Sequence, residues 1–164
     1  MTDESKPGSS DALPEGFTSP GSLSGPFTER DEPSWVDLDA LGHINHAVYL
    51  RFFENARMKY FRAVGIEGLS VGAGVGPILA TTTVNYRCPV RFPDGLLVRT
   101  SCARIGRSSF TLEAAIWSRE AGQICADGSF VIVLLDYGAD QRPTPVPEAV
   151  RAAMRALDPG LVEA

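Results

Sequence analysis

Long hydrophobic runs are missing from this 164-residue sequence, whose longest uninterrupted apolar stretch is Phe130–Leu135. A transmembrane helix needs about 20 mostly apolar residues, so this stretch is far too short to cross a bilayer. The first ten residues, MTDESKPGSS, also lack the basic and then apolar pattern of a secretory signal. We therefore expect a cytoplasmic protein that makes no contact with a membrane.

Cysteine is scarce as well. The chain has three, Cys88, Cys102 and Cys125, and their spacing matches neither a CxxC motif nor a metal-ligand pattern. A small secreted domain that depends on disulfides normally carries an even and larger number. The cysteines therefore predict reduced thiols and no bound metal.

An excess of basic residues is the third absence. The formal net charge is -5, and residues 1–34 hold seven acidic and two basic side chains, which leaves 13 of each sign in the rest. A nucleic-acid-binding domain typically carries a basic patch and a high isoelectric point. We expect no nucleic-acid partner, and an anionic ligand must be met by individual arginines.

Large apolar residues are almost absent from residues 1–26, which are rich in Ser, Gly, Pro and acidic residues. Such a segment cannot bury enough apolar surface to offset the entropy lost on ordering. We predict a disordered acidic tail over residues 1–26. The remaining residues, 27–164, suit one folded domain of ordinary size.

A long amphipathic helix is predicted between Ile44 and Val64. The apolar residues that recur at helical spacing are Tyr49, Phe52, Phe53, Ala56 and Tyr60. Asn45 suits the N-cap, where its side-chain oxygen can accept a free backbone N–H, and Gly65 suits the C-terminal end.

Strands are predicted after a glycine-rich loop, in four segments rich in β-branched and aromatic residues. They are roughly Ile78–Arg87, Leu96–Ile105, Ser109–Ser118 and Gln123–Asp136. Turn signals between them favour short antiparallel connections and hence a four-stranded meander. With a short strand before Asp37 and a last helix at Pro147–Leu157, this predicts an α+β fold whose sheet covers the aromatic face of the long helix.

Polar residues with catalytic potential are concentrated directly before the long helix. They are Asp37, Asp39, His43, Asn45 and His46. A carboxylate there can attack a carbonyl or activate water, while the free N–H groups of the helix start stabilise the oxyanion that develops. This combination is typical of acyl transfer.

The pattern DxDxxGHxNxxxYxxxxExxR, from Asp37 to Arg57, resembles the signature of the 4-hydroxybenzoyl-CoA thioesterase branch of hotdog-fold proteins. The resemblance continues through residues 86–92 and 105–110 and covers roughly residues 27–136. It implies a hotdog fold, in which a five-stranded antiparallel sheet wraps a long central helix. It also implies a homodimer or homotetramer with active sites between subunits, Asp39 as the catalytic carboxylate and the backbone N–H of His46 as the oxyanion donor.

Several of these residues have a structural alternative. We interpret Asp37 as structural, because aspartate commonly bonds nearby backbone N–H groups. His43 either transfers protons or, as we prefer, holds the loop by a ring N–H hydrogen bond. Asn45 either caps the helix or contacts the thioester, and the side chain of His46 can add an acid or base.

Candidates for substrate binding lie further along the chain. Glu54 and Arg57, three residues apart on the helix, can form a surface ion pair, which we prefer for Arg57, whereas Glu54 is a candidate to contact the partner subunit's site. The candidates for coenzyme A binding are Arg87, Arg107, Ser108 and Ser109. Arg107 is the strongest, because guanidinium, backbone N–H and hydroxyl groups in a Gly-Arg-Ser-Ser turn suit phosphate.

Thioester hydrolysis needs no cofactor, and the sequence has no cofactor motif, since Gly72, Gly74 and Gly76 are not followed by the Lys-Ser/Thr of a phosphate-binding loop. The sequence therefore predicts a thioesterase that converts acyl-CoA to free acid and coenzyme A, with Asp39 as nucleophile or general base. The alternative is a non-catalytic hotdog protein that binds or senses acyl-CoA in the same groove. The acyl chain's identity depends on tertiary packing and stays open.

Overall fold

The computed structural model describes residues 27–66 and 74–163. The predicted tail, residues 1–26, lies outside the described residues, as does most of the glycine-rich loop. Within the described part of the chain, no helix is long and apolar enough to span a membrane.

Five main strands form one antiparallel sheet in the order β1-β3-β4-β5-β2. They are β1 (Phe27–Asp31), β2 (Val75–Tyr86), β3 (Leu96–Ile105), β4 (Ser109–Ser118) and β5 (Gln123–Asp136). Two short strands extend this sheet, β6 (Arg142–Pro143) beside β5 and β7 (Val162–Glu163) parallel to β3.

The strand boundaries match the prediction better than the strand order does. β3, β4 and β5 begin and end at the predicted residues. The predicted meander is wrong for β2, which pairs with β5 from Val75↔Asp136 to Tyr86↔Ala126 instead of with β3. The segment that connects β2 to β3 therefore passes from one side of the sheet to the other, and β2 becomes an edge strand.

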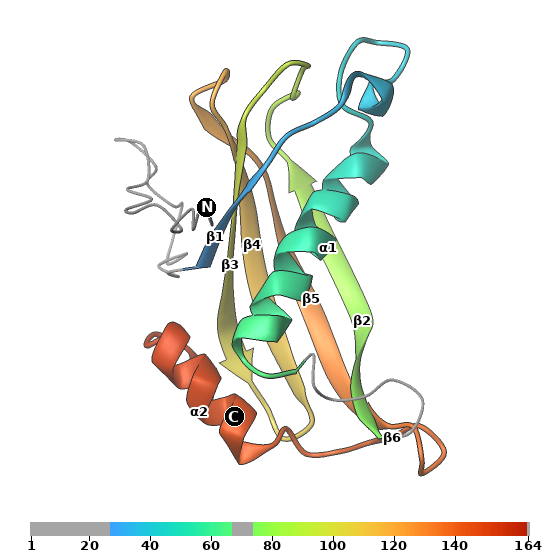
Figure 1. The fold of residues 1–164 in the computed structure, drawn as a ribbon, viewed down its shortest axis with the longest axis vertical. Helices are drawn as coiled ribbons and strands as arrows, with labels where there is room; N and C mark the ends of the chain where they lie inside the picture. The colour runs from blue at the N-terminus through green and yellow to red at the C-terminus, as the bar shows by residue number, and fades with distance from the viewer. Residues whose placement is uncertain (1–26, 67–73, 164) are drawn as a thin grey trace, which may run out of the picture.

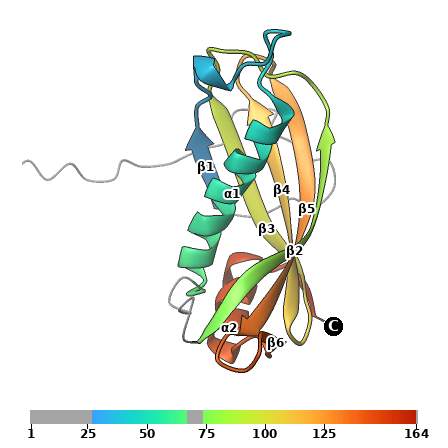
Figure 2. The ribbon, with the colours of Figure 1, turned by 90° about the vertical axis from the view of Figure 1, so that its right-hand side faces the viewer.

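The long helix α1 (His46–Ala63) lies across one face of the sheet (Figure 1, Figure 2). The Asn45 side chain accepts the N–H of Ala47 at 3.0 Å, which caps the helix start. Gly65 follows the helix end with a φ of 80°, a left-handed conformation that glycine adopts without steric cost. The predicted helix, cap and end are confirmed.

Aromatic side chains hold α1 on the sheet. The rings of Phe53 and Phe130 lie 5.1 Å apart between centroids, and those of Phe61 and Phe110 lie 6.0 Å apart. All four side chains are buried, and burying one such side chain contributes about 1.5–3 kcal/mol. The predicted α+β fold, with a central helix wrapped by an antiparallel sheet, is confirmed.

Arg57 is buried, which corrects the prediction of a surface ion pair. Only 7% of the surface of Arg57 is exposed, and its guanidinium lies 5.8 Å from the centre of the Phe130 ring. Glu54 accepts a hydrogen bond from it at 3.4 Å. Burial lowers the pKa of Arg57, although the Glu54 carboxylate opposes this effect. The prediction failed because Phe130 comes from β5, which the local helix pattern cannot place.

Two of the three cysteines are paired, which corrects the expectation of reduced thiols. Cys88 and Cys125 form a disulfide with their Cα atoms 4.4 Å apart. The pairing of β2 with β5 brings the two segments together, and the Cys125 carbonyl accepts the N–H of Arg87 at 2.7 Å. Cys102 is a free, buried thiol, and burial raises its pKa to about 12.

The second helix, α2 (Glu148–Leu157), lies at the end of the molecule opposite the first turn of α1 (Figure 1, Figure 2). Pro147 is its N-cap rather than a first-turn residue. After α2, the buried Asp158 carboxylate accepts the Tyr60 hydroxyl at 2.6 Å and the Cys102 N–H at 2.9 Å. This carboxylate joins the C-terminal segment to α1 and β3.

Candidate active site

The loop before α1 is closed by its own backbone. It follows a short 3-10 helix, η1 (Trp35–Asp37), and is bridged by Leu38 and Ile44. The N–H of Asp39 donates to the carbonyl of His43 at 2.8 Å. Gly42 sits in this turn with a φ of 72°, a value that favours glycine. The loop therefore holds Asp39 at a fixed place ahead of the helix.

Asp39 is half-buried, and only one of its carboxylate oxygens is bonded. Its Oδ1 accepts the N–H of Leu41 at 2.8 Å and that of His43 at 3.3 Å. Among the described residues, none donates to its Oδ2. The loop thus orients the carboxylate and leaves one oxygen for a water molecule or a substrate.

Asp37, two residues earlier, has a different environment. Its buried carboxylate accepts the Arg51 guanidinium at 2.7 Å and the Ser34 N–H at 2.8 Å. Burial raises the pKa of Asp37, but the hydrogen bonds from Arg51 and Ser34 outweigh burial and lower it below its usual value. Its carbonyl also accepts the N–H of Asn45 at 2.9 Å. These contacts support the structural interpretation of Asp37.

The first amide of α1, that of His46, is free to bind a ligand. The Asn45 side chain is occupied by the N–H of Ala47, and the Asn45 carbonyl accepts the N–H of Val48 at 2.9 Å. In residues 27–66 and 74–163, no acceptor is bonded to the N–H of His46. Because the helix dipole adds partial positive charge there, this N–H suits an anionic oxygen.

Asp39 and His46 line one open cavity of about 320 Å³. The other residues that line it are His43, Ile44, Tyr49, Tyr86, Arg87, Cys88 and Pro89. The Tyr86 hydroxyl donates to the His46 carbonyl at 3.2 Å, and the rings of Tyr49 and Tyr86 meet edge to face, 5.2 Å apart. The cavity therefore lies where the start of α1 meets the end of β2.

Both tyrosines were missed as site residues. Tyr49 was assigned to the apolar face of the helix, yet its hydroxyl accepts the N–H of Val90 at 3.1 Å and supports the cavity wall. Tyr86 stands directly before Arg87 at the end of a predicted strand. Its place beside the helix depends on the pairing of β2 with β5, which local sequence does not reveal.

His43 differs from its preferred interpretation. Its backbone holds the loop, but its ring Nε2 is buried and makes no hydrogen bond to any described residue. The predicted ring N–H hydrogen bond is therefore not present at this nitrogen. The ring lines the cavity instead.

Of the predicted substrate-binding residues Arg87 and Glu54, only Arg87 lines the cavity. Arg87 lines the cavity and forms an ion pair with Asp127 at 2.5 Å, which raises the pKa of Arg87 through their hydrogen bond. Glu54 is exposed on α1 and does not line the cavity. No group of three or more His, Cys, Asp or Glu side chains within the described ranges is placed to hold a metal.

Arg107 and Ser108 lie at the other end of the sheet, in the β3–β4 turn, and Ser109 is the first residue of β4. The Ser108 carbonyl accepts the N–H of Leu134, whereas the backbone N–H of Arg87, beside the cavity, donates to the carbonyl of Cys125. Both partners belong to β5, and the nine residue steps from Cys125 to Leu134 span about 30 Å at the usual rise of a strand. One protomer therefore does not bring Arg107 to Asp39.

Comparison with known proteins gives consistent matches. The family model described as thioesterase-like superfamily matches residues 33–154. The acyl-CoA thioesterase YbgC of Haemophilus influenzae is 25% identical over 125 residues, which cover 75% of this chain and 90% of that protein. The long-chain acyl-CoA thioesterase FadM of Escherichia coli is 26% identical over 99 residues, with 60% and 75% covered.

A solved structure of a thioesterase from Thermus thermophilus, complexed with coenzyme A and Zn, is similar in fold and in sequence. It is 33% identical with a TM-score of 0.70, and the alignment covers 82% of this chain and 96% of that one. The family match spans the loop, α1, all strands from β2 to β5 and every residue that lines the cavity.

Proposed function

Because this chain belongs to the thioesterase-like superfamily and is a hotdog-fold thioester hydrolase, we propose that its cavity hydrolyses acyl-CoA to free acid and coenzyme A. One observation carries the proposal. A carboxylate with a free oxygen, on Asp39, and a free helix-start N–H, on His46, line the same cavity. A carboxylate base or nucleophile and an oxyanion donor are together able to hydrolyse a thioester without a cofactor.

Asp39 acts in one of two ways. As a general base, it takes a proton from water, the water oxygen bonds to the thioester carbon, and the C–S bond breaks to release coenzyme A thiolate. As a nucleophile, its free oxygen bonds to that carbon and expels the thiolate, and water then hydrolyses the anhydride. In both cases the carbonyl oxygen gains negative charge, and the His46 N–H donates to it.

The other loop residues support these two groups. Asn45 caps α1 and so fixes the helix start, where the N–H of His46 is left for the substrate. The backbone of His43 fixes the Asp39 carboxylate, and the His43 ring forms part of the wall. Arg87, held in place by Asp127, offers guanidinium N–H donors to the coenzyme where it enters.

We further propose a homodimer joined through β2. This edge strand has exposed apolar side chains, with Ile78 43% and Leu79 41% exposed, and an unpaired edge invites pairing with another chain. Two antiparallel copies of β2 place the cavity end of one protomer beside the opposite end of its partner. That arrangement brings Arg107 of the partner subunit, with its neighbouring serines, towards the coenzyme, and leaves Glu54 near the seam.

The size of the cavity supports a shared site. A volume of 320 Å³ is near the lower limit of ligand pockets, roughly 300–1,000 Å³, so most of an acyl-CoA lies outside it. Sedimentation at micromolar concentration should show a dimer or tetramer with no major monomer. A stable monomer with full activity contradicts the shared site.

Thiol release from acetyl-, aryl- and C6 to C16 acyl-CoAs tests the activity and identifies the acyl group. Asp39→Asn is the matched variant, because asparagine keeps the oxygen that accepts from Leu41 and His43 and removes only the charge. We expect many turnovers by the wild type and a loss of kcat of at least ~10²-fold in the variant. Saturable binding without thiol release favours the non-catalytic alternative.

A single turnover in ¹⁸O-labelled water separates the two roles of Asp39. A nucleophile ends with the label in its own side chain, whereas a general base delivers the label to the product acid. If Asp39→Asn turns over at the wild-type rate while Asp37→Asn or His43→Ala is inactive, the catalytic carboxylate has been assigned to the wrong residue.

A further inference from the structure

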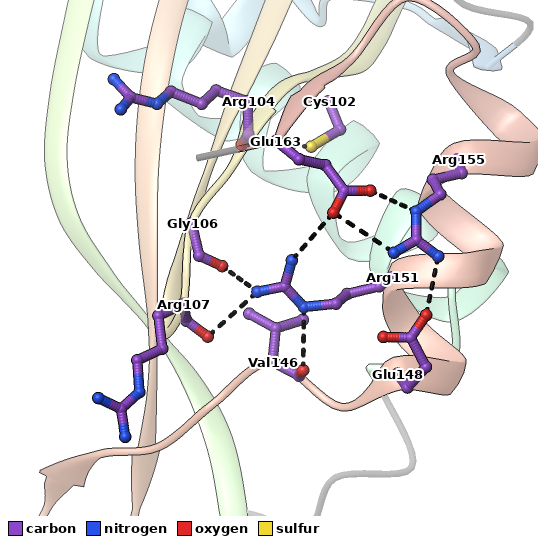
Figure 3. Close-up of polar contacts among 9 residues, drawn as sticks. All are labelled: Cys102, Arg104, Gly106, Arg107, Val146, Glu148, Arg151, Arg155 and Glu163. Atoms are coloured by element: carbon purple, nitrogen blue, oxygen red, sulfur yellow. Dashed lines mark hydrogen bonds and ion pairs between the residues drawn. The ribbon is translucent and has the colours of Figure 1, made fainter.

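Arg151 of α2 reaches the β3–β4 turn and binds its backbone (Figure 3). Its guanidinium donates to the carbonyl of Gly106 and, at 3.4 Å, to that of Arg107. The Arg151 side chain is only 15% exposed, and Glu163 lies 3.6 Å from it as a counter-ion. A largely buried, neutralised arginine therefore clamps the turn that carries the coenzyme-binding candidates.

The clamp completes a set of backbone hydrogen bonds. The Arg107 carbonyl also accepts the N–H of Val146 at 2.8 Å, and the Ser108 carbonyl accepts that of Leu134 at 2.9 Å. The Ser109 carbonyl accepts the N–H of Gly106 at 2.7 Å. Every carbonyl from residue 106 to 109 is thus bonded within the protein, so none of these negative dipoles is left free to repel an anion at the turn.

Two arginines are left without acidic partners on the other side of this turn. The side chains of Arg104 and Arg107 point away from α2 (Figure 3), both are exposed, and neither forms an ion pair within the described residues. Two exposed guanidinium groups without a carboxylate partner create a locally positive surface that favours an anion nearby. Guanidinium groups match phosphate oxygens in geometry and charge.

We propose that Arg151 is a positioning residue that fixes the β3–β4 turn, so that Arg104 and Arg107 bind the phosphate groups of coenzyme A. This inference rests on the proposed function and adds Arg104 as a binding residue. Arg151 does not touch the substrate. It acts through the Gly106 and Arg107 carbonyls. The Glu163 carboxylate balances the positive charge of Arg151, so that Arg151 does not compete with Arg104 and Arg107 for the phosphates.

Arg155 provides the matched control. It lies one turn further along α2 and pairs with Glu148 at 2.8 Å and with Glu163, but none of the contacts drawn for it in Figure 3 is to the β3–β4 turn. Arg155→Gln therefore makes the same arginine-to-glutamine change in the same ion-pair network, but it leaves the contact between Arg151 and the turn intact. Arg151→Lys tests geometry, because one ammonium group cannot reproduce the forked contact of a guanidinium.

The experiment measures kcat and KM for an acyl-CoA and for the matching acyl-pantetheine, which lacks the nucleotide phosphates. For Arg151→Gln we expect KM for acyl-CoA to rise on the order of tenfold, with kcat and the acyl-pantetheine values within about twofold, because a phosphate contact acts on ground and transition states alike. Arg104→Gln should behave in the same way, Arg151→Lys should be intermediate, and Arg155→Gln should resemble the wild type.

Equal losses on both substrates, or no change in KM for acyl-CoA, overturn the inference. If Arg151→Gln does not fold, Arg104→Gln, which changes an exposed residue, is the test. Its KM should rise for acyl-CoA and not for acyl-pantetheine, and any other result overturns the inference. If the wild type releases no thiol, the proposed function fails, and calorimetric binding of coenzyme A still tests the inference. Affinity should then fall in Arg151→Gln and Arg104→Gln but not in Arg155→Gln.

Discussion

The oxyanion role proposed for the His46 amide can be tested by removing that one donor. His46→Pro deletes the backbone N–H at the first helical position, where proline is well tolerated. A residue before proline must be extended, and Asn45 already has φ -58° and ψ 138°. Because the N–H has no acceptor among the described residues, its loss breaks no hydrogen bond, and the free enzyme should keep its fold.

The expected size of the effect follows from the matched variant His46→Ala, which loses the same exposed imidazole but keeps the N–H. Loss of one oxyanion donor typically lowers kcat by about 10²–10³-fold, or about 2.7–4 kcal/mol. We expect this difference in kcat between the two variants at saturating acyl-CoA, with similar KM. Thiol release and thermal denaturation provide the measurements. Equal kcat values in two equally stable variants refute the assignment.

Three further predictions concern stability. Asp37→Asn should lower Tm while kcat stays within a few-fold. Because the folded-state pKa of Asp37 is lowered, its contribution is present above about pH 4 and is lost as pH falls through that pKa, so the Tm difference from wild type should narrow in acid. Tyr60→Phe should cost about 1–3 kcal/mol in urea denaturation, because the buried Asp158 carboxylate loses a donor, and a cost below about 0.5 kcal/mol contradicts this contact. Deletion of residues 1–26 should leave Tm and turnover nearly unchanged, and a large loss of either means that the tail contributes to the fold or the site.

The local elements of this fold could be predicted from sequence because their signals are local. The helix follows from the spacing of its aromatic residues, and its limits follow from Asn45 and Gly65. The strands β3, β4 and β5 are bounded by turn residues that cannot continue a strand. The loop that carries Asp39 could also be predicted from a local signal, because Asp37, Asp39 and Gly42 lie within six positions of the sequence.

Features set by distant parts of the chain could not be predicted. The partner of β2 is β5, and this pairing alone brings Cys88 to Cys125 and Tyr86 to the helix start. Arg57 is buried because Phe130 packs against it, although its place in the sequence suggests an exposed charge. Arg151 shows no sign of its role in its own neighbourhood, because the carbonyls that it binds lie over 40 residues earlier.

The strand order also has a consequence for how the chain folds during synthesis. β2 and β5 pair over sequence separations of 61 residues at Val75–Asp136 and 40 at Tyr86–Ala126. β3, β4 and β5 are joined by short turns and can pair as soon as each emerges from the ribosome, whereas β2 must wait for β5 with both of its edges open. A nascent chain that stalls before residue 123 therefore exposes a long, unpaired strand, and such chains are expected to aggregate or to require a chaperone.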